Sequence, residues 1–426
     1  MNFFKMKSLS EFMVFALVIM IYAVVNHAEH QNMKALRVFC DTDKQMKTVA
    51  SFEGQLGFDF LLMPRSKLRP VEVLVSMNNV QSFINTLQKH GIRYEIHADD
   101  VHEMIRKEMN AQQVITMRFG DEKELPLTYY PRYNEVKEYL ESLGQLYEGY
   151  VTTSSIGKSY EGRELLIVKF STGGGRKPAL LIDAGIHARE WIAPTTALFA
   201  IKQLAENPSS RYIFQNVDLY IIPMINPDGY EYTHHNETTR LWRKTRSKLP
   251  GSDCFGVDAN RNFDFNWLGA GTSSVPCSNT YAGPYAFSEP ETRALRDFVL
   301  AHKNDIKAYL SLHSFGQYML HPWGYTSDLP VNEPTLKCVA EKAAKALQEV
   351  NGTPYQIGSS TNLLYAAAGG SDDYVMAVGK VPLSYTIELP GGYFQFAPPP
   401  KYINFIGEET FEAIKVFANY IDKQIC

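Results

Sequence analysis

The chain has 426 residues, of which 45% are hydrophobic and 21% charged, with a formal net charge of −4 at pH 7. This length exceeds what one compact domain usually holds, so we expect two folded units of ordinary globular composition. The negative balance argues against a nucleic-acid partner, although a local basic patch would still be compatible with it.

The N-terminal segment carries Lys5 and Lys7 before an uncharged apolar run from Phe12 to Val25. That run is short for a bilayer span but suits the core of a secretory signal peptide. We therefore expect residues 1–28 to be removed near Ala28 and the rest to be secreted to the extracellular space without a membrane anchor. An uncleaved anchor is the alternative.

Cysteine and asparagine positions fit a secreted protein. Five cysteines leave one unpaired, and Cys254 and Cys277 flank a loop-rich stretch that suits a disulfide. Cys338 could pair with Cys426 and leave Cys40 free, but the sequence does not decide this. Two Asn-x-Thr motifs are possible glycosylation sites, at positions 236 and 351.

Residues 34 to about 112 alternate short apolar runs with amphipathic ones. The expected strands are Leu36–Phe39, Val71–Val75 and Arg93–His97. The expected helices are Asn79–His90 and Val101–Ala111. This order predicts a small ferredoxin-like α/β unit. Because it carries no nucleophile or metal cluster, we interpret it as non-catalytic.

A polar, proline-bearing stretch from Asn110 to Pro131 follows this unit. It is a plain interdomain linker on one interpretation. On the other it is an activation site, because Arg118 and Lys123 would suit a trypsin-like protease and such linkers concentrate cleavage. We expect the cut after Arg118.

Residues 119–426 predict a second, larger α/β domain. The expected strands are Leu165–Phe170, Ala179–Ile182, Val217–Ile222, Ala308–Leu312 and Leu383–Leu389, and the expected helices are Tyr133–Leu143, Trp191–Leu204, Pro290–His302, Thr335–Val350 and Glu408–Ile421. Alternation of this kind predicts a mixed, mainly parallel sheet with helices on both faces and a site at the carboxyl ends of its strands.

Three residues of this domain are candidate zinc ligands. His187 and Glu190 lie three positions apart just after a predicted strand, so the turn of a starting helix could direct both at one ion. His313 follows another predicted strand, although a lone histidine there is more often a hydrogen-bonded core residue. Two histidines and one carboxylate leave a fourth position open, as in catalytic zinc sites.

A carboxylate and two arginine-bearing segments complete the candidate chemistry. Glu388 projects from an apolar strand on the face opposite Ile387, where an unpaired charge is costly, so it is either a catalytic base or half of a structural ion pair. The segments Arg240–Lys244 and Val257–Asn262 could bind an anionic substrate end through a guanidinium, or form ordinary solvated or loop-bracing contacts.

Seven motifs in order resemble those of the digestive-type zinc metallocarboxypeptidases, nearest to the B-type. They are His187–Glu190, Ile225–Gly229, Arg240–Arg243, Gly256–Asn262, Leu312–Ser314, Gly369–Asp373 and Thr386–Leu389. The resemblance implies an eight-stranded sheet, a prodomain at 29–118 and a catalytic domain at 119–426.

The resemblance also implies a role for each matching residue. One zinc would be held by His187, Glu190 and His313. Glu388 would be the general base and Arg243 would stabilise the oxyanion. The terminal carboxylate would be bound by Asn260, Arg261 and Tyr365, and the outer subsites would be lined by Arg189 and Phe396.

Specificity in the resembled family depends on the position that matches Asp372. A-type members carry an apolar residue there and B-type members an aspartate, so the resemblance implies removal of C-terminal Lys and Arg. Gly324 would leave the pocket roomy, whereas Ser360 stands where B-type enzymes tend to have glycine. Phe315 departs from the family's tyrosine and would change only an outer subsite.

We therefore expect a secreted digestive zymogen, monomeric, that acts on peptide and protein C-termini after a trypsin-like protease has activated it. An A-type enzyme for apolar or aromatic ends is one alternative. A non-catalytic relative that only binds chain ends is another, but the complete set of ligands together with Glu388 argues against it.

Overall fold

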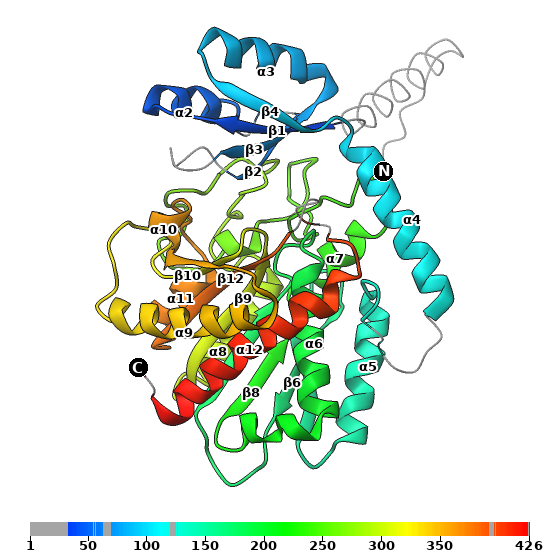
Figure 1. Ribbon diagram of the computed structural model, residues 1–426, viewed down its shortest axis with the longest axis vertical. Coiled ribbons are helices and arrows are strands. Elements are labelled where there is room, and N and C mark those ends of the chain that lie inside the picture. Colours follow the sequence, from blue (N-terminus) through cyan, green and yellow to red (C-terminus); the bar gives the residue numbers. More distant parts are fainter. Residues whose placement is uncertain are drawn as a thin grey trace, which may run out of the picture. The chain divides into compact units, whose positions relative to one another are not determined.

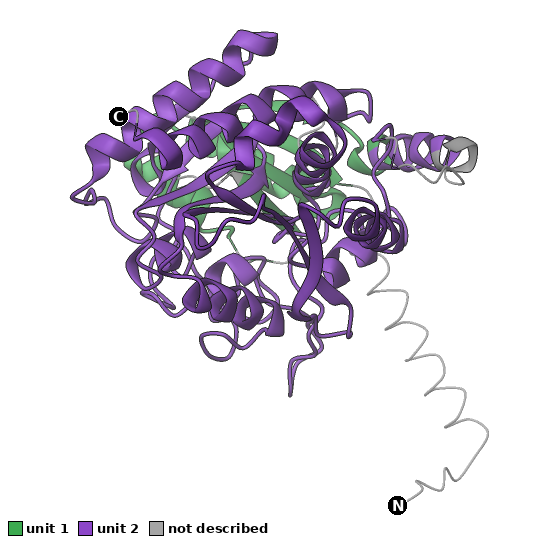
Figure 2. Cartoon of the chain, turned by 90° about the horizontal axis from the view of Figure 1, so that it is seen from below, with its two compact units in different colours: residues 1–104 green, residues 105–426 purple. Residues whose placement is uncertain are grey.

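The computed structural model describes residues 33–53, 55, 57–62, 70–119, 125, 127–391, 396, 398–424 and 426. The expected signal peptide and Lys123 lie outside the described residues. The chain forms two compact units, Met1–Met104 and Ile105–Cys426 (Figure 2). A compactness boundary does not locate a cleavage site, so the domain boundary at residue 118 stays a prediction.

The first unit is a four-stranded antiparallel sheet with two helices. In chain order its elements are β1 (Met33–Phe39), α2 (Asp43–Ala50), β2 (Phe58–Leu62), β3 (Val71–Ser76), α3 (Met77–Lys89) and β4 (Arg93–Ala98). The strand order β2-β3-β1-β4 is the ferredoxin-like arrangement, which confirms the predicted fold. The sequence analysis missed α2 and β2, which are short.

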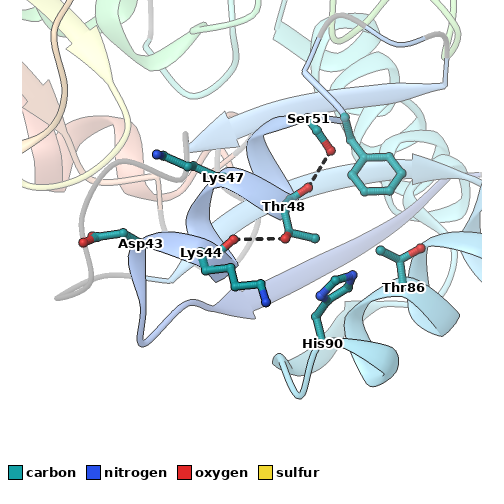
Figure 3. A pocket seen from close by; sticks show the side chains of 8 residues that line it. Asp43, Lys44, Lys47, Thr48, Ser51, Thr86 and His90 are labelled. Carbon is teal, nitrogen blue, oxygen red and sulfur yellow. Dashed lines mark hydrogen bonds between the residues drawn. The ribbon is translucent and has the colours of Figure 1, made fainter.

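The surface of this unit has a groove between α2 and α3 (Figure 3). It is lined by Asp43, Lys44, Lys47, Thr48, Ser51, Phe52, Thr86 and His90. The hydroxyls of Thr48 and Ser51 donate to backbone carbonyls of their own helix, so they are already satisfied. Among the described side chains that line it, the groove has one histidine and no group of potential metal ligands.

The helix that follows is longer than predicted. We expected it to end at Ala111, but α4 spans Val101–Phe119 and crosses the division between the two units. Its continuation has a physical basis, because no proline interrupts the chain before Pro126 and Gln112 is held within the second unit. The Gln112 amide donates to Tyr130 O at 2.6 Å and accepts from Tyr130 N at 3.1 Å.

The second unit contains an eight-stranded sheet (Figure 1). Its strands are β5 (Val151–Lys158), β6 (Glu164–Phe170), β7 (Ala179–Ala184), β8 (Asp218–Ile222), β9 (Ile306–Ser314), β10 (Tyr318–His321), β11 (Gln356–Ser359) and β12 (Leu383–Leu389). They are ordered β11-β10-β12-β9-β7-β8-β6-β5, and β12, β9, β7 and β8 are parallel neighbours at the centre. The predicted mixed sheet is confirmed.

Helices cover both faces of this sheet. They are α5 (Tyr133–Leu146), α6 (Ile192–Glu206), α7 (Pro227–Thr233), α8 (Pro290–Ala301), α9 (Glu333–Asn351), α10 (Ser360–Leu363), α11 (Ser371–Ala377) and α12 (Tyr402–Lys423). One core packs α5, α6, α9 and α12 on one face, and a smaller core packs α8 and α11 on the other. Figure 1 shows α9 and α12 crossing in front of the strands.

The second unit also holds two disulfides. Cys254 pairs with Cys277 and Cys338 with Cys426, with Cα–Cα distances of 5.2 and 6.2 Å, and Cys40 is a free, buried thiol in the first unit. The expected first pair is confirmed, and the second is one of the arrangements that the sequence left open. Within the described part of the chain, no helix is both long and apolar enough to span a bilayer.

Candidate metal and catalytic site

The carboxyl ends of three parallel strands bring the candidate residues together. β7 leads directly to His187, β9 carries His313 near its end, and β12 carries Glu388 at the same level. The strand register pairs Glu388 with His313 across β12 and β9. Side chains at paired positions lie on the same face of a sheet, so this pairing places the two residues side by side. The predicted location at the strand ends is therefore confirmed.

His187 and Glu190 lie in a turn rather than in the first turn of a helix. The turn is closed by Glu190 N, which donates to His187 O at 3.3 Å, and α6 begins only at Ile192. The chain leaves β7 through Gly185, whose φ is +70°. A Cβ there would lie 2.9 Å from Pro194 Cγ, so glycine permits the close approach that directs His187 back over the sheet.

The side chains of His187, Glu190 and His313 converge beside this turn. His187 Nδ1 lies 2.8 Å from Glu190 Oε1 and 3.2 Å from His313 Nδ1, and His313 Nδ1 lies 3.2 Å from Glu190 Oε2. All three residues are at least 96% buried. They form the one group of potential metal ligands found among the described residues, which confirms the predicted ligand set.

These separations fit a tetrahedral zinc ion. Ligands about 2.0–2.1 Å from zinc lie about 3.3 Å from one another at tetrahedral angles. The two buried imidazole nitrogens need a proton or a cation between them at this distance. Without it, at least one nitrogen lone pair has no hydrogen-bond donor. A cation satisfies both imidazoles and neutralises the charge of Glu190, so the chemistry of the donor set suits zinc.

The electrostatics of the ligands favour a bound cation. Burial acts to raise the pKa of Glu190, but His187 and His313 outweigh it and hold that pKa below its usual range. Burial opposes charging of His313, yet its bond to Glu190 raises the pKa of His313 to about 9. Burial and the charge of Arg243 lower the pKa of His187. Glu190 is therefore an anion that attracts positive charge into this space.

Asp258 links one ligand to the predicted oxyanion-stabilising arginine. Its Oδ1 lies 3.2 Å from His187 Nε2, and its Oδ2 accepts from Arg243 at 2.9 and 3.1 Å. Asp258 is fully buried, and despite this burial the charge of Arg243 holds its pKa well below the usual range. One carboxylate thus orients a metal ligand and a guanidinium together.

Glu388 is poised to exchange a proton. It projects from β12 on the face opposite Ile387 and Leu389, which pack in the larger core, and its side chain is partly exposed. Burial, opposed by His313 and reinforced by Glu190, raises the pKa of Glu388 to about 8. The charge of a bound zinc acts in the opposite direction. Such a carboxylate can accept a proton near neutral pH.

Two of the three predicted carboxylate-binding residues, Asn260 and Arg261, lie on a short helix beside the metal ligands. The helix η2 (Ala259–Arg261) starts at Asp258, and Arg261 is 3% exposed, with Nε donating to Gly271 O. Gly369 packs against this helix, because a Cβ there would lie only 2.5 Å from Arg261 O. Burial opposes the charge of Arg243, but Asp258, Glu190 and Tyr365 raise its pKa. The Tyr365 phenol therefore lies near that guanidinium.

The predicted pocket floor is also adjacent. The amide N–H of Ser371 donates to Asn260 Oδ1, which joins the start of α11 to η2. The next residue, Asp372, is 6% exposed, and its Oδ2 accepts from Thr386 Oγ1 at 3.3 Å and from Ser360 Oγ at 3.5 Å. Asp373 instead accepts from the backbone of Gly324 and therefore has a structural role.

The two predicted outer-subsite residues contact each other. The guanidinium of Arg189 lies 4.2 Å from the ring centroid of Phe396, and that ring packs edge-on against Phe315 at 5.1 Å. Arg189, Phe396 and Phe315, the last at the position where the resembled family has tyrosine, therefore form one cluster, and the role of Arg189 and Phe396 in an outer subsite stays a prediction. Arg189 and Phe396 are 2% and 4% exposed.

Arg240 has a partner that the sequence did not suggest. Its buried guanidinium donates to the Glu108 carboxylate of α4 at 3.0 and 3.2 Å. It also donates to the backbone carbonyls of Arg189 and Phe396 at 2.8 and 3.0 Å. The two arginines of this motif therefore have different contacts. Arg243 faces the metal ligands, whereas Arg240 holds the backbone of Arg189 and Phe396.

Sequence reasoning missed three residues behind the ligands, namely Asp258, Asp183 and Ser311. Asp258 stands inside one of the recognised motifs and precedes the carboxylate-binding pair, which was an available signal. Asp183 and Ser311 carried no signal, because only the pairing of β7 with β9 brings them together.

The chain is similar to known proteins along most of its length. A family described as zinc carboxypeptidase matches residues 136–413, and one described as carboxypeptidase activation peptide matches residues 36–108. The chain is 48% identical to carboxypeptidase B of Astacus astacus over 69% of its own length and 97% of that protein. It is 40% identical to carboxypeptidase B of Helicoverpa zea, over 95% of this chain and 98% of the relative.

A-type relatives are also similar. Carboxypeptidase A1 of Bos taurus is 36% identical, with 92% of this chain and 94% of the relative covered. The crystal structure of carboxypeptidase A from Helicoverpa armigera matches with a TM-score of 0.87 at 33% identity, covering 92% of this chain and 98% of that one. With its buried His-Glu-His set and its activation peptide, this chain belongs to the zinc carboxypeptidase family.

Proposed function

We propose that this metallocarboxypeptidase removes C-terminal lysine and arginine from peptides, and that it is secreted as a zymogen. The observation that carries the specificity is Asp372, a buried carboxylate beside the carboxylate-binding helix. No lysine or arginine among the described residues forms an ion pair with it, and its Oδ1 has no hydrogen-bond partner within that part of the chain.

An unpaired buried carboxylate favours a cationic substrate side chain. A substrate ending in lysine or arginine supplies the missing charge, whereas an apolar end would leave the carboxylate desolvated and unpaired. Thr386 and Ser360 both donate to Oδ2, which leaves Oδ1 for the substrate. Because Ser360 contacts the carboxylate directly, its side chain also narrows the pocket relative to glycine.

The reaction needs a positioned base and a stabilised oxyanion. Zinc, when bound, polarises the scissile carbonyl and lowers the pKa of water. Glu388 accepts a proton from the attacking water and returns it to the leaving amine. Arg243, held by Asp258, donates to the oxygen on which negative charge develops. Arg261, Asn260 and Tyr365 bind the free carboxylate, which restricts cleavage to the last residue of the chain.

The alternatives have weaker support. An A-type preference is compatible with the bovine and Helicoverpa armigera relatives but leaves Asp372 without a function. A non-catalytic chain-end binder has no use for Glu388 beside a complete ligand set. The two B-type relatives, at 48% and 40% identity, add support for the basic specificity.

Activation by cleavage after Arg118 is part of the proposal. The activation-peptide match supports a zymogen, and α4 ends at Phe119, so the scissile bond would lie in the last turn of a helix, where fraying is easiest. Secretion is proposed from the apolar run at residues 12–25. We further propose a monomer cleaved by a trypsin-like protease.

Replacing Glu388 by glutamine should abolish most catalysis without removing the metal. We expect kcat/KM to fall by about 10²–10⁴-fold, the usual contribution of a general base, with one zinc per chain retained. In the zinc-loaded parent enzyme kcat/KM should fall at acid pH, because protonated Glu388 cannot accept a proton. The midpoint of that fall should lie below pH 8, since the charge of bound zinc lowers the pKa of Glu388 from its metal-free value of about 8. A near-parent rate for E388Q on a peptide ending in arginine would refute the assignment.

Replacing Asp372 by isoleucine should reverse the preference for basic ends. Loss of a buried charge pair costs about 3–5 kcal/mol, so we expect kcat/KM for peptides ending in Lys or Arg to fall by about 10²–10³-fold while peptides ending in Phe improve. The matched control is S360G, which keeps the carboxylate and should keep the basic preference. An unchanged Arg-over-Phe ratio in D372I would contradict the proposal.

Blocking cleavage at Arg118 should keep the enzyme inactive. Trypsin treatment of the R118Q chain should yield far less activity than treatment of the parent or of a K123Q control. Mass spectrometry of the products identifies the bond that is cut. Full activity of intact chain, or activation of R118Q equal to that of K123Q, would be inconsistent with this activation site.

A further inference from the structure

The second histidine ligand is backed by a buried chain of hydrogen bonds. His313 Nε2 lies 3.1 Å from Ser311 Oγ, and Ser311 Oγ donates to Asp183 Oδ1 at 2.7 Å. Asp183 and Ser311 are fully buried and His313 is 1% exposed. None of the seven motifs assigns a role to Asp183 or Ser311, and they do not contact the reacting atoms.

The sheet itself builds this chain. Asp183 of β7 is the register partner of Ser311 of β9, and His313 lies two residues farther along β9, on the same face. The second oxygen of Asp183 accepts from the hydroxyl of Tyr309, which lies two residues before Ser311. Rigid paired strands therefore fix all four groups, whereas His187 depends on a turn.

The count of protons decides the direction of each bond. Both oxygens of Asp183 accept, Oδ1 from Ser311 and Oδ2 from Tyr309, so the single proton of Ser311 is committed to Oδ1. The Ser311 oxygen can then only accept from His313, which requires the proton of the neutral imidazole to be on Nε2. The lone pair is left on Nδ1, the atom that faces Glu190 Oε2 and His187 Nδ1 at 3.2 Å.

We propose that Ser311 and Asp183 are positioning residues that hold His313 in the Nε2–H tautomer and thereby retain the zinc ion. The arrangement parallels that of His187, whose Nε2 contacts Asp258 directly at 3.2 Å. The difference is that the Ser311 hydroxyl lies between the Asp183 carboxylate and His313. Partners behind metal ligands commonly contribute about 10–100-fold to metal affinity.

Replacing Ser311 by alanine tests the proposal through zinc retention. We expect the zinc-loaded full chain to release zinc to an excess of chelator about 10–100-fold faster than the parent, measured as released metal. Ser311→Cys nearly preserves the side-chain volume, and its sulfur is a weak acceptor, so it should change the release rate in the same direction. The cysteine variant therefore tests the proposal even if the alanine variant does not fold.

The matched control is Tyr309→Phe. It removes the other hydroxyl from the same carboxylate but leaves the bond between Ser311 and His313 in place. We expect the rate of zinc release from Tyr309→Phe to stay within about threefold of the parent rate. The melting temperature of the metal-free protein should shift in both Tyr309→Phe and Ser311→Ala. Release from S311A and S311C at the parent rate would overturn the proposal. Equal acceleration in Y309F would also overturn it, because the effect would then come from the fold.

Discussion

Two imidazole nitrogens and a carboxylate are held 2.8–3.2 Å apart in the buried interior of this protein, and the rest of the catalytic unit serves to keep them there. Such atoms do not gather unaided, because Nδ1 of His187 and of His313 lie 3.2 Å apart and Glu190 adds a buried negative charge. A divalent cation resolves this conflict. The parallel strands β7, β9 and β12 make the cluster possible by ending at the same edge of the sheet.

The same arrangement couples binding to chemistry. Asp258 contacts a ligand and Arg243, and η2, which starts at Asp258, also carries Asn260 and Arg261. Asn260 in turn accepts from the backbone of Ser371, the neighbour of the pocket-floor Asp372. A displacement of this short helix would therefore move the oxyanion donor, the carboxylate-binding residues and the pocket floor together.

The sequence predicted the ligands better than their support. His187, Glu190 and His313 could be found because they stand at the ends of apolar strands and within recognisable motifs. The strands β10 and β11 were missed because each has four residues, and β5 because it is polar and only its first residue is buried. The contacts of Asp183 with Ser311 and of Glu108 with Arg240 could not be predicted, because they depend on pairing and packing between distant segments.

Anomalous diffraction at the zinc absorption edge would test the central claim most directly. We predict one peak per chain, bonded at about 2.0–2.2 Å by Nδ1 of His187, Nδ1 of His313 and the Glu190 carboxylate. Coordination through Nε2 of either histidine, or a zinc peak away from these three side chains, would contradict the account.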